Sequence, residues 1–485
     1  MPDLETLQLL GPELALTGIA LLIFVLDLFL KRREDILGWL ALAGMIATVL
    51  ISLPLAIQSR TILSGMLAVD PLAVYFKIIA ALTTALVLMA SVDYLRTRSA
   101  YRGEFYGLMV LATLSMTLLA ASTDLIMIFI SLEFLSLTSY VLVGYLRHDW
   151  LSTEGGLKYL LYGAVTTAIT LYGMSLVYGV TGSTSLEAIA QALADPANPM
   201  AQNQAILLPS LIFVLAGFAF KISLVPFHQW TPDAYEGAPI PVAAFLSVGP
   251  KAAGFAILLR TLLVAFPSLQ VDWIAVLSGI AVVTMTFGNL VAIQQRNIKR
   301  LLAYSSISQA GYILLGVIAF WVGFGTPGVL IYVLAYLFTN LGAFIVVVAF
   351  SHLTGSDDIH DYAGLVRRAP FLALALVVFF MSLAGIPPTG GFLGKLYVFG
   401  AAIQAGFWPL AVAGVLNSVV SLYYYFGVVR QMFFLPPKPP LSLPVPRALL
   451  AAIVISLAGT LIMGIYPQPF IELATDSVAI VGQLP

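Results

Sequence analysis

Residues 217–255 read GFAFKISLVPFHQWTPDAYEGAPIPVAAFLSVGPKAAGF, and this stretch decides the fold class. It places Lys221 and Lys251 deep inside two successive apolar segments, with Pro226 interrupting the first and Pro250 beside the second lysine. A cation at bilayer depth costs about 2.5 to 3.5 kcal/mol on insertion scales, so it is retained mainly where it faces a partner or a wet cavity. Two such lysines in one helical hairpin predict a path for protons or ions across a membrane.

The composition agrees with a membrane location. Of the 485 residues, 60% are hydrophobic and only 9% are charged, which is too little polar surface for a soluble globule. The net charge of -1 gives no reason to expect nucleic acid. Because the chain has no cysteine, thiolate-ligated iron–sulfur clusters and disulfides are excluded. The four histidines are scattered, so neither a haem nor a metal site is predicted.

Fourteen apolar runs are each long enough to cross a hydrocarbon core of about 30 Å as a helix. The expected fold is therefore an all-α polytopic membrane protein, and the first run is expected to be a retained helix and not a cleaved signal peptide. The runs are 11–30, 36–57, 71–95, 104–122, 124–145, 158–180, 206–229, 239–265, 271–293, 299–321, 326–352, 371–402, 404–433 and 447–466.

The positions of lysine and arginine predict the orientation, because these residues are enriched in cytoplasmic loops. Alternate loops carry sixteen of them, whereas the other loops, the adjoining helix ends and both termini carry only Arg60 and Arg260. Both termini are therefore expected on the outer side. The sixteen are Lys31, Arg32, Arg33, Arg96, Arg98, Arg102, Arg147, Lys158, Arg296, Lys299, Arg300, Arg367, Arg368, Arg430, Lys438 and Arg447.

Two short matches predict an internal repeat. GFAFK at 217–221 recurs as GFLGK at 391–395, and YVLVG at 140–144 recurs as YILLG at 312–316, at nearly the same offset. The spans in 104–265 and in 271–433 would then be two five-helix units, and five is odd, so the second unit is inverted in the membrane. Residues 1–103 supply three N-terminal spans, and 434–485 supply a loop and the last span.

Prolines and glycines predict that the seventh and twelfth spans are broken. Proline removes a backbone donor and clashes with the preceding turn, and the freed carbonyl groups need water or a polar neighbour at membrane depth. The breaks are expected at Pro226, and at Pro387-Pro388 with Gly390-Gly391.

Four buried ionisable residues are the candidate site: Glu133, Lys221, Lys251 and Lys395. Burial disfavours the charged form of lysine and a nearby carboxylate favours it, so movement of Glu133 relative to Lys221 would switch that lysine between holding and releasing a proton. The alternatives are a static Glu133–Lys221 ion pair, a structural contact of Lys251 with a carbonyl group, and a capping role for Lys395 at its broken helix.

Other polar residues have less specific interpretations. Lys77 is expected to snorkel to the outer interface. His228 is a candidate proton relay or an interfacial hydrogen-bonding residue. Asp233 and Glu236 are expected to cap the next helix or to contact a partner, and not to bind metal. Two polar stripes would order water or serve helix packing; they comprise Ser131, Ser136, Thr138, Ser139 and Tyr140, and Ser305, Ser306, Ser308 and Gln309.

At these residues the chain resembles the antiporter-like membrane subunits of respiratory complex I, the proton-pumping NADH:quinone oxidoreductase. The resemblance rests on residues 220–255, on NIKRLLAYSSISQAGY at 297–312 and on AGIPPTGGFLGKLYVF at 384–399, and YEGAP followed by SVGPKAAGF is the N-type form. It implies that Glu133, Lys221, Lys251 and Lys395 are the family's proton-transfer residues on its fifth, seventh, eighth and twelfth helices.

The resemblance further implies a multi-pass subunit of a bacterial inner membrane, with K- and M-type subunits adjacent, a hydrophilic redox arm acting indirectly, lipid around it and no nucleic acid. NAD, FMN, iron–sulfur clusters and quinone would be bound by partner subunits and not by this chain. The alternatives are a subunit of a Mrp-type sodium/proton antiporter and a structural spacer with vestigial lysines.

Overall fold

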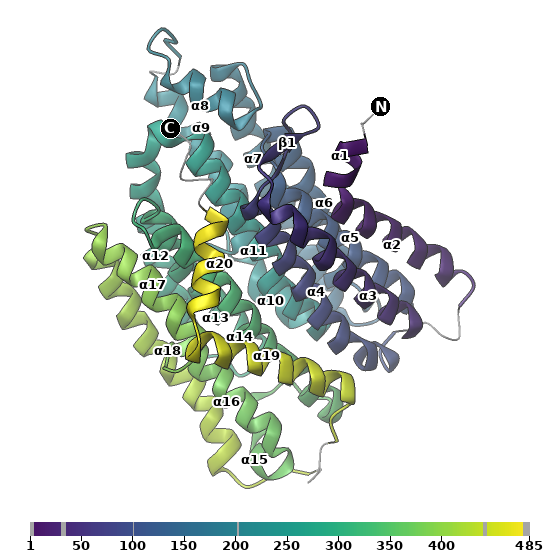
Figure 1. Ribbon diagram of the computed structural model, residues 1–485. Helices are drawn as coiled ribbons and strands as arrows, with labels where there is room; N and C mark the ends of the chain where they lie inside the picture. Colours follow the sequence, from purple (N-terminus) through teal and green to yellow (C-terminus); the bar gives the residue numbers. More distant parts are fainter. Residues whose placement is uncertain (1–3, 31–34, 100, 201–202, 440–443, 479–485) are drawn as a thin grey trace.

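The computed structural model describes residues 4–30, 35–99, 101–200, 203–439 and 444–478, which form a nearly all-helical bundle (Figure 1). The N-terminal part precedes the helices that carry the site. Its elements are α1 (Leu4–Leu9), α2 (Gly11–Asp27), α3 (Asp35–Ser52), η1 (Leu53–Ile57), β1 (Arg60–Ile62), β2 (Leu67–Val69) and α4 (Pro71–Arg96). The two strands form an antiparallel hairpin in which Thr61 pairs with Ala68.

The next two groups of helices cover the regions expected to form the two five-helix units. The first group is α5 (Arg102–Ala121), α6 (Leu125–Val143), α7 (Trp150–Thr181), α8 (Leu186–Ala194), α9 (Gln204–Ile222), α10 (Trp230–Gly237) and α11 (Ile240–Ala265). The second is η2 (Pro267–Leu269), α12 (Gln270–Ala292), α13 (Ile298–Ile318), α14 (Gly325–Thr354), η3 (Ile359–Tyr362), α15 (Leu365–Arg368), α16 (Pro370–Ala384), α17 (Gly390–Gln404) and α18 (Trp408–Phe434). The chain continues through α19 (Arg447–Ile465) and α20 (Gln468–Val478).

Twelve helices in the described residues are long and apolar enough to cross a membrane. Two further predicted spans correspond to α2, which has 17 residues, and to the interrupted pair α16 and α17. The short helices α8, α10 and α20 were not predicted from the sequence. These are too short to cross a bilayer, so a search for long apolar runs passes over them.

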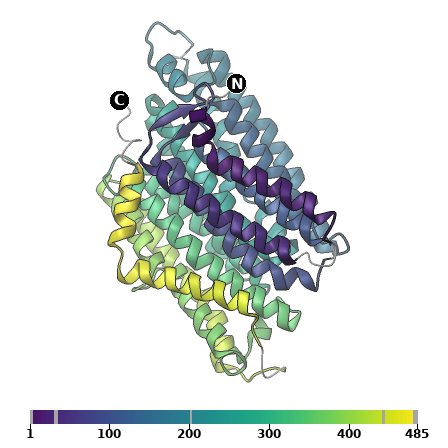
Figure 2. The same cartoon turned by 45° about the vertical axis from the view of Figure 1, so that its right-hand side comes forward.

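The helices α11, α13 and α14 form the interior of the bundle. They are almost wholly buried, whereas α7, α12, α18 and α19 leave much of their apolar surface on the outside. Figures 1 and 2 show the N-terminal helices α2 and α3 (purple) on one flank, and α19 and α20 (yellow) on the surface of another. The fold thus places its most polar interior helix, α13, at the centre.

Both predicted helix breaks are present. At the first break, α9 ends at Ile222, and Ser223 adopts a left-handed conformation with φ 63° before α10 begins at Trp230. The second break separates Ala384 from Gly390. In each case the proline lies in the segment between two half-helices, as expected for a residue that cannot donate to the helical ladder.

Two cations expected at the interface or at a helix end are buried in the bundle. Lys77 does not snorkel: its side chain is 2% exposed and its Nζ lies 2.7 Å from Glu13 Oε1 of α2. Arg260 was assigned to a helix end, yet it is 4% exposed and makes two hydrogen bonds of 2.7 and 2.9 Å to Asp70, the N-cap of α4. A buried acid on a neighbouring helix provides each cation with a partner, so neither needs to reach the interface.

Candidate functional site

Glu133 and Lys221 face each other from α6 and α9. Lys221 is 1% exposed, and its Nζ donates a hydrogen bond of 2.9 Å to the hydroxyl of Ser136, one turn beyond Glu133. Glu133 is half-buried and accepts a hydrogen bond of 2.6 Å from Thr167 of α7. In the part of the chain that the structure describes, no ion pair within 4.0 Å joins the two residues, so a direct, static pair is not what holds them.

A small cavity lies between the two charged groups. Its volume is about 20 Å³, and its lining includes Glu133, Ser136, Thr167 and Lys221. A space of this size with several polar partners is sufficient for one water molecule. The carboxylate and the ammonium group can therefore interact through one intervening group, either Ser136 or water.

Lys251 lies deeper in the bundle, on α11. Its side chain is 3% exposed, and its Nζ donates to Ser306 of α13 twice, to the carbonyl oxygen at 2.9 Å and to the hydroxyl at 2.7 Å. The same hydroxyl accepts a second hydrogen bond, of 2.8 Å, from Tyr336 of α14. The lysine does contact a carbonyl group, and the same serine also links it to a polar chain on α13 and α14.

Lys395 of α17 closes the series. Its Nζ donates to the carbonyl oxygens of Leu383 at 2.9 Å and Ala384 at 3.0 Å, and to the hydroxyl of Ser418 at 2.9 Å. It also lies 4.5 Å from the centre of the Tyr312 ring. Gly385, with φ 87°, ends α16 and leaves room for the lysine stem, because a β carbon there would approach Lys395 Cδ to 2.7 Å.

The carbonyl oxygen of Leu383 connects Lys395 to α13. It also accepts a hydrogen bond of 2.9 Å from Gln309, whose side-chain oxygen accepts one of 2.5 Å from Tyr332. Gln309 follows Ser306 by three residues and therefore lies on the same face of α13. The helix α13 thus carries polar groups that reach Lys251 on one side and Lys395 on the other.

The two break lysines lie on opposite sides of their breaks. Lys221 is in the last turn of α9, before the break, whereas Lys395 is in α17, after the break. The GFAFK and GFLGK match consequently does not align the two breaks. What the two lysines share is the C-terminal end of a half-helix, because Lys395 reaches back to the last carbonyl groups of α16, and a cation is favoured at that end.

A polar cluster around Tyr312 was not predicted from the sequence. Asn289 of α12 donates to the Tyr312 hydroxyl at 2.8 Å and accepts from the Tyr424 hydroxyl at 2.9 Å, and it also donates to Asn417 of α18 at 3.4 Å. Asparagines inside two apolar spans were the available signal. The cluster extends the polar interior from Lys395 towards α12 and α18.

His228 lies between α9 and α10, and its ring packs edge-on against Phe287 at 4.6 Å. It is 7% exposed, and its Nδ1 has no hydrogen-bond partner among the described residues. The contacts described for this part of the chain do not join it directly to the four candidate residues. Its assignment as a proton relay stays a prediction.

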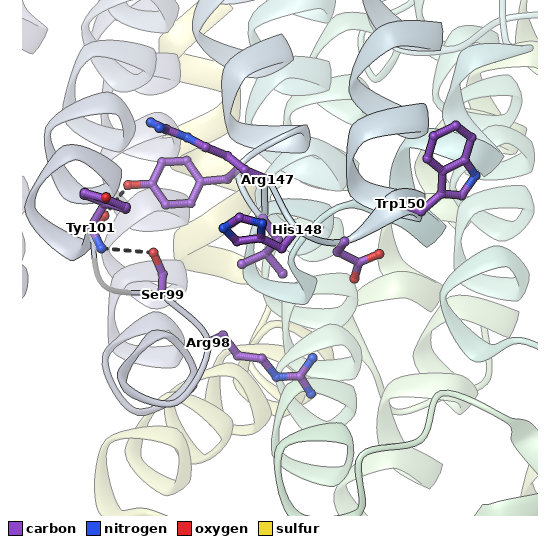
Figure 3. A pocket seen from close by; sticks show the side chains of 9 residues that line it. Arg98, Ser99, Tyr101, Arg147, His148 and Trp150 are labelled. Carbon is purple, nitrogen blue, oxygen red and sulfur yellow. Dashed lines mark hydrogen bonds between the residues drawn. The ribbon is translucent and has the colours of Figure 1, made fainter.

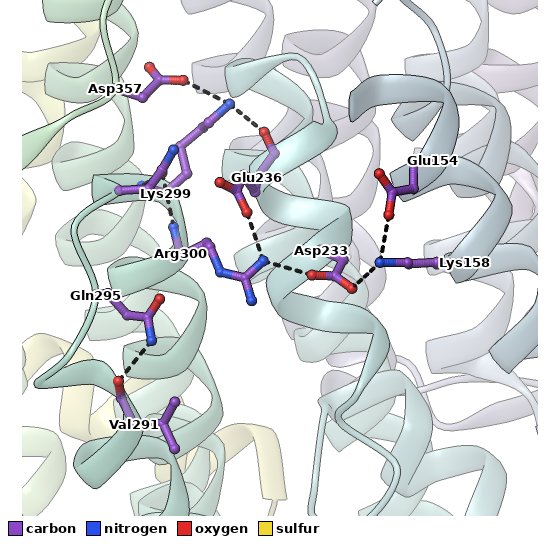
Figure 4. Close-up of polar contacts among 10 residues, drawn as sticks. Glu154, Lys158, Asp233, Glu236, Val291, Gln295, Lys299, Arg300 and Asp357 are labelled. Carbon is purple, nitrogen blue, oxygen red and sulfur yellow. Dashed lines mark hydrogen bonds and ion pairs between the residues drawn. The ribbon is translucent and has the colours of Figure 1, made fainter. Parts of the chain in front are cut away.

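Asp233 and Glu236 of α10 belong to a network of charges at one face of the bundle (Figure 4). Arg300 of α13 pairs with both carboxylates at 2.7 Å, and Lys158 of α7 pairs with Asp233 at 2.8 Å. The expectation that they cap the next helix is wrong, because α11 begins after Pro239 without a side-chain cap. These two acids instead connect α7, α10 and α13. The network also includes Glu154, Lys299 and Asp357.

A cavity of about 720 Å³ opens between the loops that precede α5 and α7 (Figure 3). Arg98, Arg147 and His148 line it together with Tyr101 and Trp150. None of the four candidate residues lines this cavity, although it is much larger than the one beside Lys221. Among the described residues, no group of three or more histidines, aspartates or glutamates has the arrangement of a metal site.

Fold and site together define a class: a polytopic helical membrane protein with two broken helices and a series of one half-buried acid and three buried lysines. A family model described as "NADH:quinone oxidoreductase/Mrp antiporter, TM" matches residues 122–421. The chain belongs to this family.

Individual relatives match nearly the whole chain. NADH-quinone oxidoreductase subunit N of Trichlorobacter lovleyi is 43% identical over 484 residues, covering 98% of this chain and 97% of the relative. NAD(P)H-quinone oxidoreductase subunit 2 of Synechocystis sp. is 43% identical, covering 96% and 92%.

Solved structures show the same fold. A chain of respiratory complex I from Thermus thermophilus with bound aureothin superposes with a TM-score of 0.80 at 33% identity, covering 96% of this chain and 99% of that one. A chain of the Mrp complex from Dietzia sp. superposes with a TM-score of 0.82, covering 99% and 98%, but at 23% identity this likeness concerns the fold alone.

Proposed function

We propose that this chain is the N-type proton-translocating membrane subunit of a complex I-like NADH:quinone oxidoreductase. The observation that carries the proposal is the series Glu133, Lys221, Lys251 and Lys395, in which each side chain ends on polar groups of another helix or helix segment inside the bundle. Relatives named as subunit N along almost the entire chain support the assignment.

In this function Glu133 controls whether Lys221 holds or releases a proton. A carboxylate close to a buried ammonium group stabilises its charge, and withdrawal of the carboxylate allows the lysine to release a proton. Ser136 and the small cavity beside it give the two groups room to change their separation. Lys251 and Lys395 would then receive and pass on protons through the polar groups of α13.

The chain is proposed to work as part of a translocase whose electron-transfer chemistry lies elsewhere. Quinone, NAD, FMN and iron–sulfur clusters would be held by partner subunits, with K- and M-type membrane subunits as neighbours. The proposed location is a bacterial inner membrane, with both termini on the outer side and the face that carries Arg98, Arg147 and Arg300 in the cytoplasm. Residues 104–265 and 271–433 are proposed as two inverted units.

The proposal is tested with the complete complex in sealed vesicles, by measuring quinone reduction and proton uptake together. Lys221→Met removes the charge but keeps a similar stem volume, so the complex should assemble while proton uptake falls by a factor on the order of 100. The control is the double variant Glu13→Gln/Lys77→Met, which alters another buried lysine outside the series and should pump normally. Normal pumping by assembled Lys221→Met would overturn the proposal.

The proteins that copurify in mild detergent test the Mrp alternative. NADH-binding and quinone-binding subunits are expected to copurify with the chain. If the chain copurified only with other subunits of a cation/proton antiporter, it would belong to a Mrp-type complex. That result would remain compatible with the family, which includes both kinds of subunit.

A further inference from the structure

The proposed proton path between Lys221 and Lys251 is not continuous in hydrogen bonds among the described residues. Lys221 ends on Ser136 of α6, and Lys251 ends on Ser306 of α13. No hydrogen bond in the described part of the chain links one lysine, or its serine, to the other. If both lysines carry the same proton, other groups must bridge the two serines.

Three tyrosines lie between them, on α6, α7 and α10. Tyr140 is 8% exposed, and Tyr159 and Tyr235 are fully buried. Among the described residues, none of the three hydroxyl groups has a hydrogen-bond partner. A buried hydroxyl without a partner costs about 1–3 kcal/mol, so three of them between two proton-carrying lysines require an explanation.

The aromatic packing fixes these tyrosines as a continuous group. The rings of Tyr140 and Tyr159 meet edge-on at 4.7 Å, Tyr159 stacks on Trp230 at 4.0 Å, and Trp230 meets Tyr235 at 6.1 Å. The indole N–H of Trp230 is already donated to the carbonyl oxygen of Phe220, at 3.1 Å. Trp230 therefore holds the tyrosine rings in place without satisfying their hydroxyl groups.

The two ends of the group reach the two serines. The Tyr140 hydroxyl lies close to the Ser136 hydroxyl, one turn earlier on α6, without a direct hydrogen bond between them. The Tyr235 hydroxyl lies close to Ser306 and to Tyr159, again without a direct hydrogen bond. The order is therefore Lys221, Ser136, Tyr140, Tyr159, Tyr235, Ser306 and Lys251. Direct hydrogen bonds close only the first and last steps. Each middle step therefore needs a bridging water molecule to become continuous.

We propose that Tyr140, Tyr159 and Tyr235 relay protons between Lys221 and Lys251, with water between their hydroxyl groups. In one passage Lys221 loses one proton and Lys251 gains one. Each hydroxyl accepts a proton on one side and releases its own on the other, so no tyrosine changes its net protonation. The relay rests on the proposed function, and it assigns the connection to hydroxyl groups and not to direct exchange between the lysines.

Tyrosine-to-phenylalanine variants test the relay, because each removes one hydroxyl and keeps the ring packing. In the complete complex in vesicles, Tyr159→Phe and Tyr235→Phe should each lower redox-driven proton uptake by a factor on the order of 100, the lower end of the range for loss of a positioned proton donor. The matched control is Tyr362→Phe. The Tyr362 hydroxyl is also without a hydrogen-bond partner among the described residues, but its ring stacks on Phe350 and lies near Asp357, away from the two lysines. This variant should pump normally.

Subunit content of the purified complex separates assembly from transport, and Tyr235→Phe decides the test if Tyr159→Phe does not assemble. A larger solvent deuterium isotope effect on uptake in the surviving variant would support the relay, since a packing defect alone does not slow proton movement. Normal uptake by Tyr159→Phe and Tyr235→Phe would overturn the relay. If Lys221→Met still blocked uptake in that case, the proposed function would stand; if it did not, the proposed function would fail as well.

Discussion

Lys251 and Ser306 are joined by two hydrogen bonds, although 55 residues separate them in the sequence. This double contact fixes the ammonium group of α11 against α13, the helix that also reaches Lys395 through Gln309 and the Leu383 carbonyl. Ser306 is therefore the point at which a lysine of the first group of helices meets the polar chain of the second.

Ser306→Ala should weaken both stability and pumping. The variant leaves the Ser306 carbonyl for Lys251 but removes the acceptor of Tyr336, so we expect a loss of about 1–3 kcal/mol in stability. Thermal denaturation of the purified complex and proton uptake measure the two effects. Ser278→Ala is the control, because the Ser278 hydroxyl has no hydrogen-bond partner among the described residues. Equal behaviour of the two variants would contradict this role for Ser306.

Glu133→Gln should impair pumping more than assembly. The amide oxygen can still accept the hydrogen bond from Thr167, but the side chain can no longer carry the charge that stabilises Lys221. We expect uptake to fall by a factor on the order of 100, measured per assembled complex. Parallel losses of subunit content and uptake would instead mean that Glu133 is structural.

The buried pair Lys77 and Glu13 should stabilise the N-terminal helices without taking part in pumping. Removing one partner leaves an uncompensated buried charge, so Lys77→Met or Glu13→Gln alone should each cost about 3–5 kcal/mol. The double variant should recover much of this loss. Thermal denaturation of the complex provides the double-mutant cycle, and additive losses would show that the 2.7 Å contact contributes nothing.

The network around Asp233 should give a stability that depends on pH. Burial would raise the pKa of Asp233, but hydrogen bonds from Lys158 and Arg300 outweigh burial and hold this pKa below its usual range. The stabilisation is therefore present above the ordinary aspartate value of about 3.9 and is lost as pH falls through the lower folded value.

Asp233→Asn should accordingly lower the thermal midpoint of the complex at pH 7, and its difference from the unmodified protein should vanish only below about pH 4. Asp195→Asn, in the exposed loop after α8, is the control. A difference that disappeared between pH 5 and pH 7 would point to another group.

The sequence alone was sufficient to select the four candidate residues, whose roles stay a prediction. A charged side chain in an apolar run is conspicuous, and so are prolines that interrupt one, so the four candidates could be proposed and both helix breaks were predicted correctly. The twelve long spans followed from local hydrophobicity. Charged residues, prolines and apolar runs can each be recognised within a short stretch of sequence, so no knowledge of helix packing was needed.

The interaction partners of charged residues could not be predicted from the sequence in the same way. Whether Lys77 snorkels or pairs depends on which helix lies beside it, and the apolar pattern of a span does not encode its neighbours. Glu13 and Lys77 do lie near the same end of their helices, so the pair could have been suspected. The network of Asp233, Arg300 and Lys158 required three separate helices to be placed together.

The helix α14 has a mechanical consequence. It runs for 30 residues, a rod of about 45 Å, and packs against α11, α13, α16, α17, α19 and α20. A rod enclosed on every side in a close-packed interior has no free volume to slide or tilt into. We therefore expect α14 to stay fixed while the subunit works. Conformational changes passed on from neighbouring subunits would then act through side-chain rotamers and hydrogen bonds at the two helix breaks.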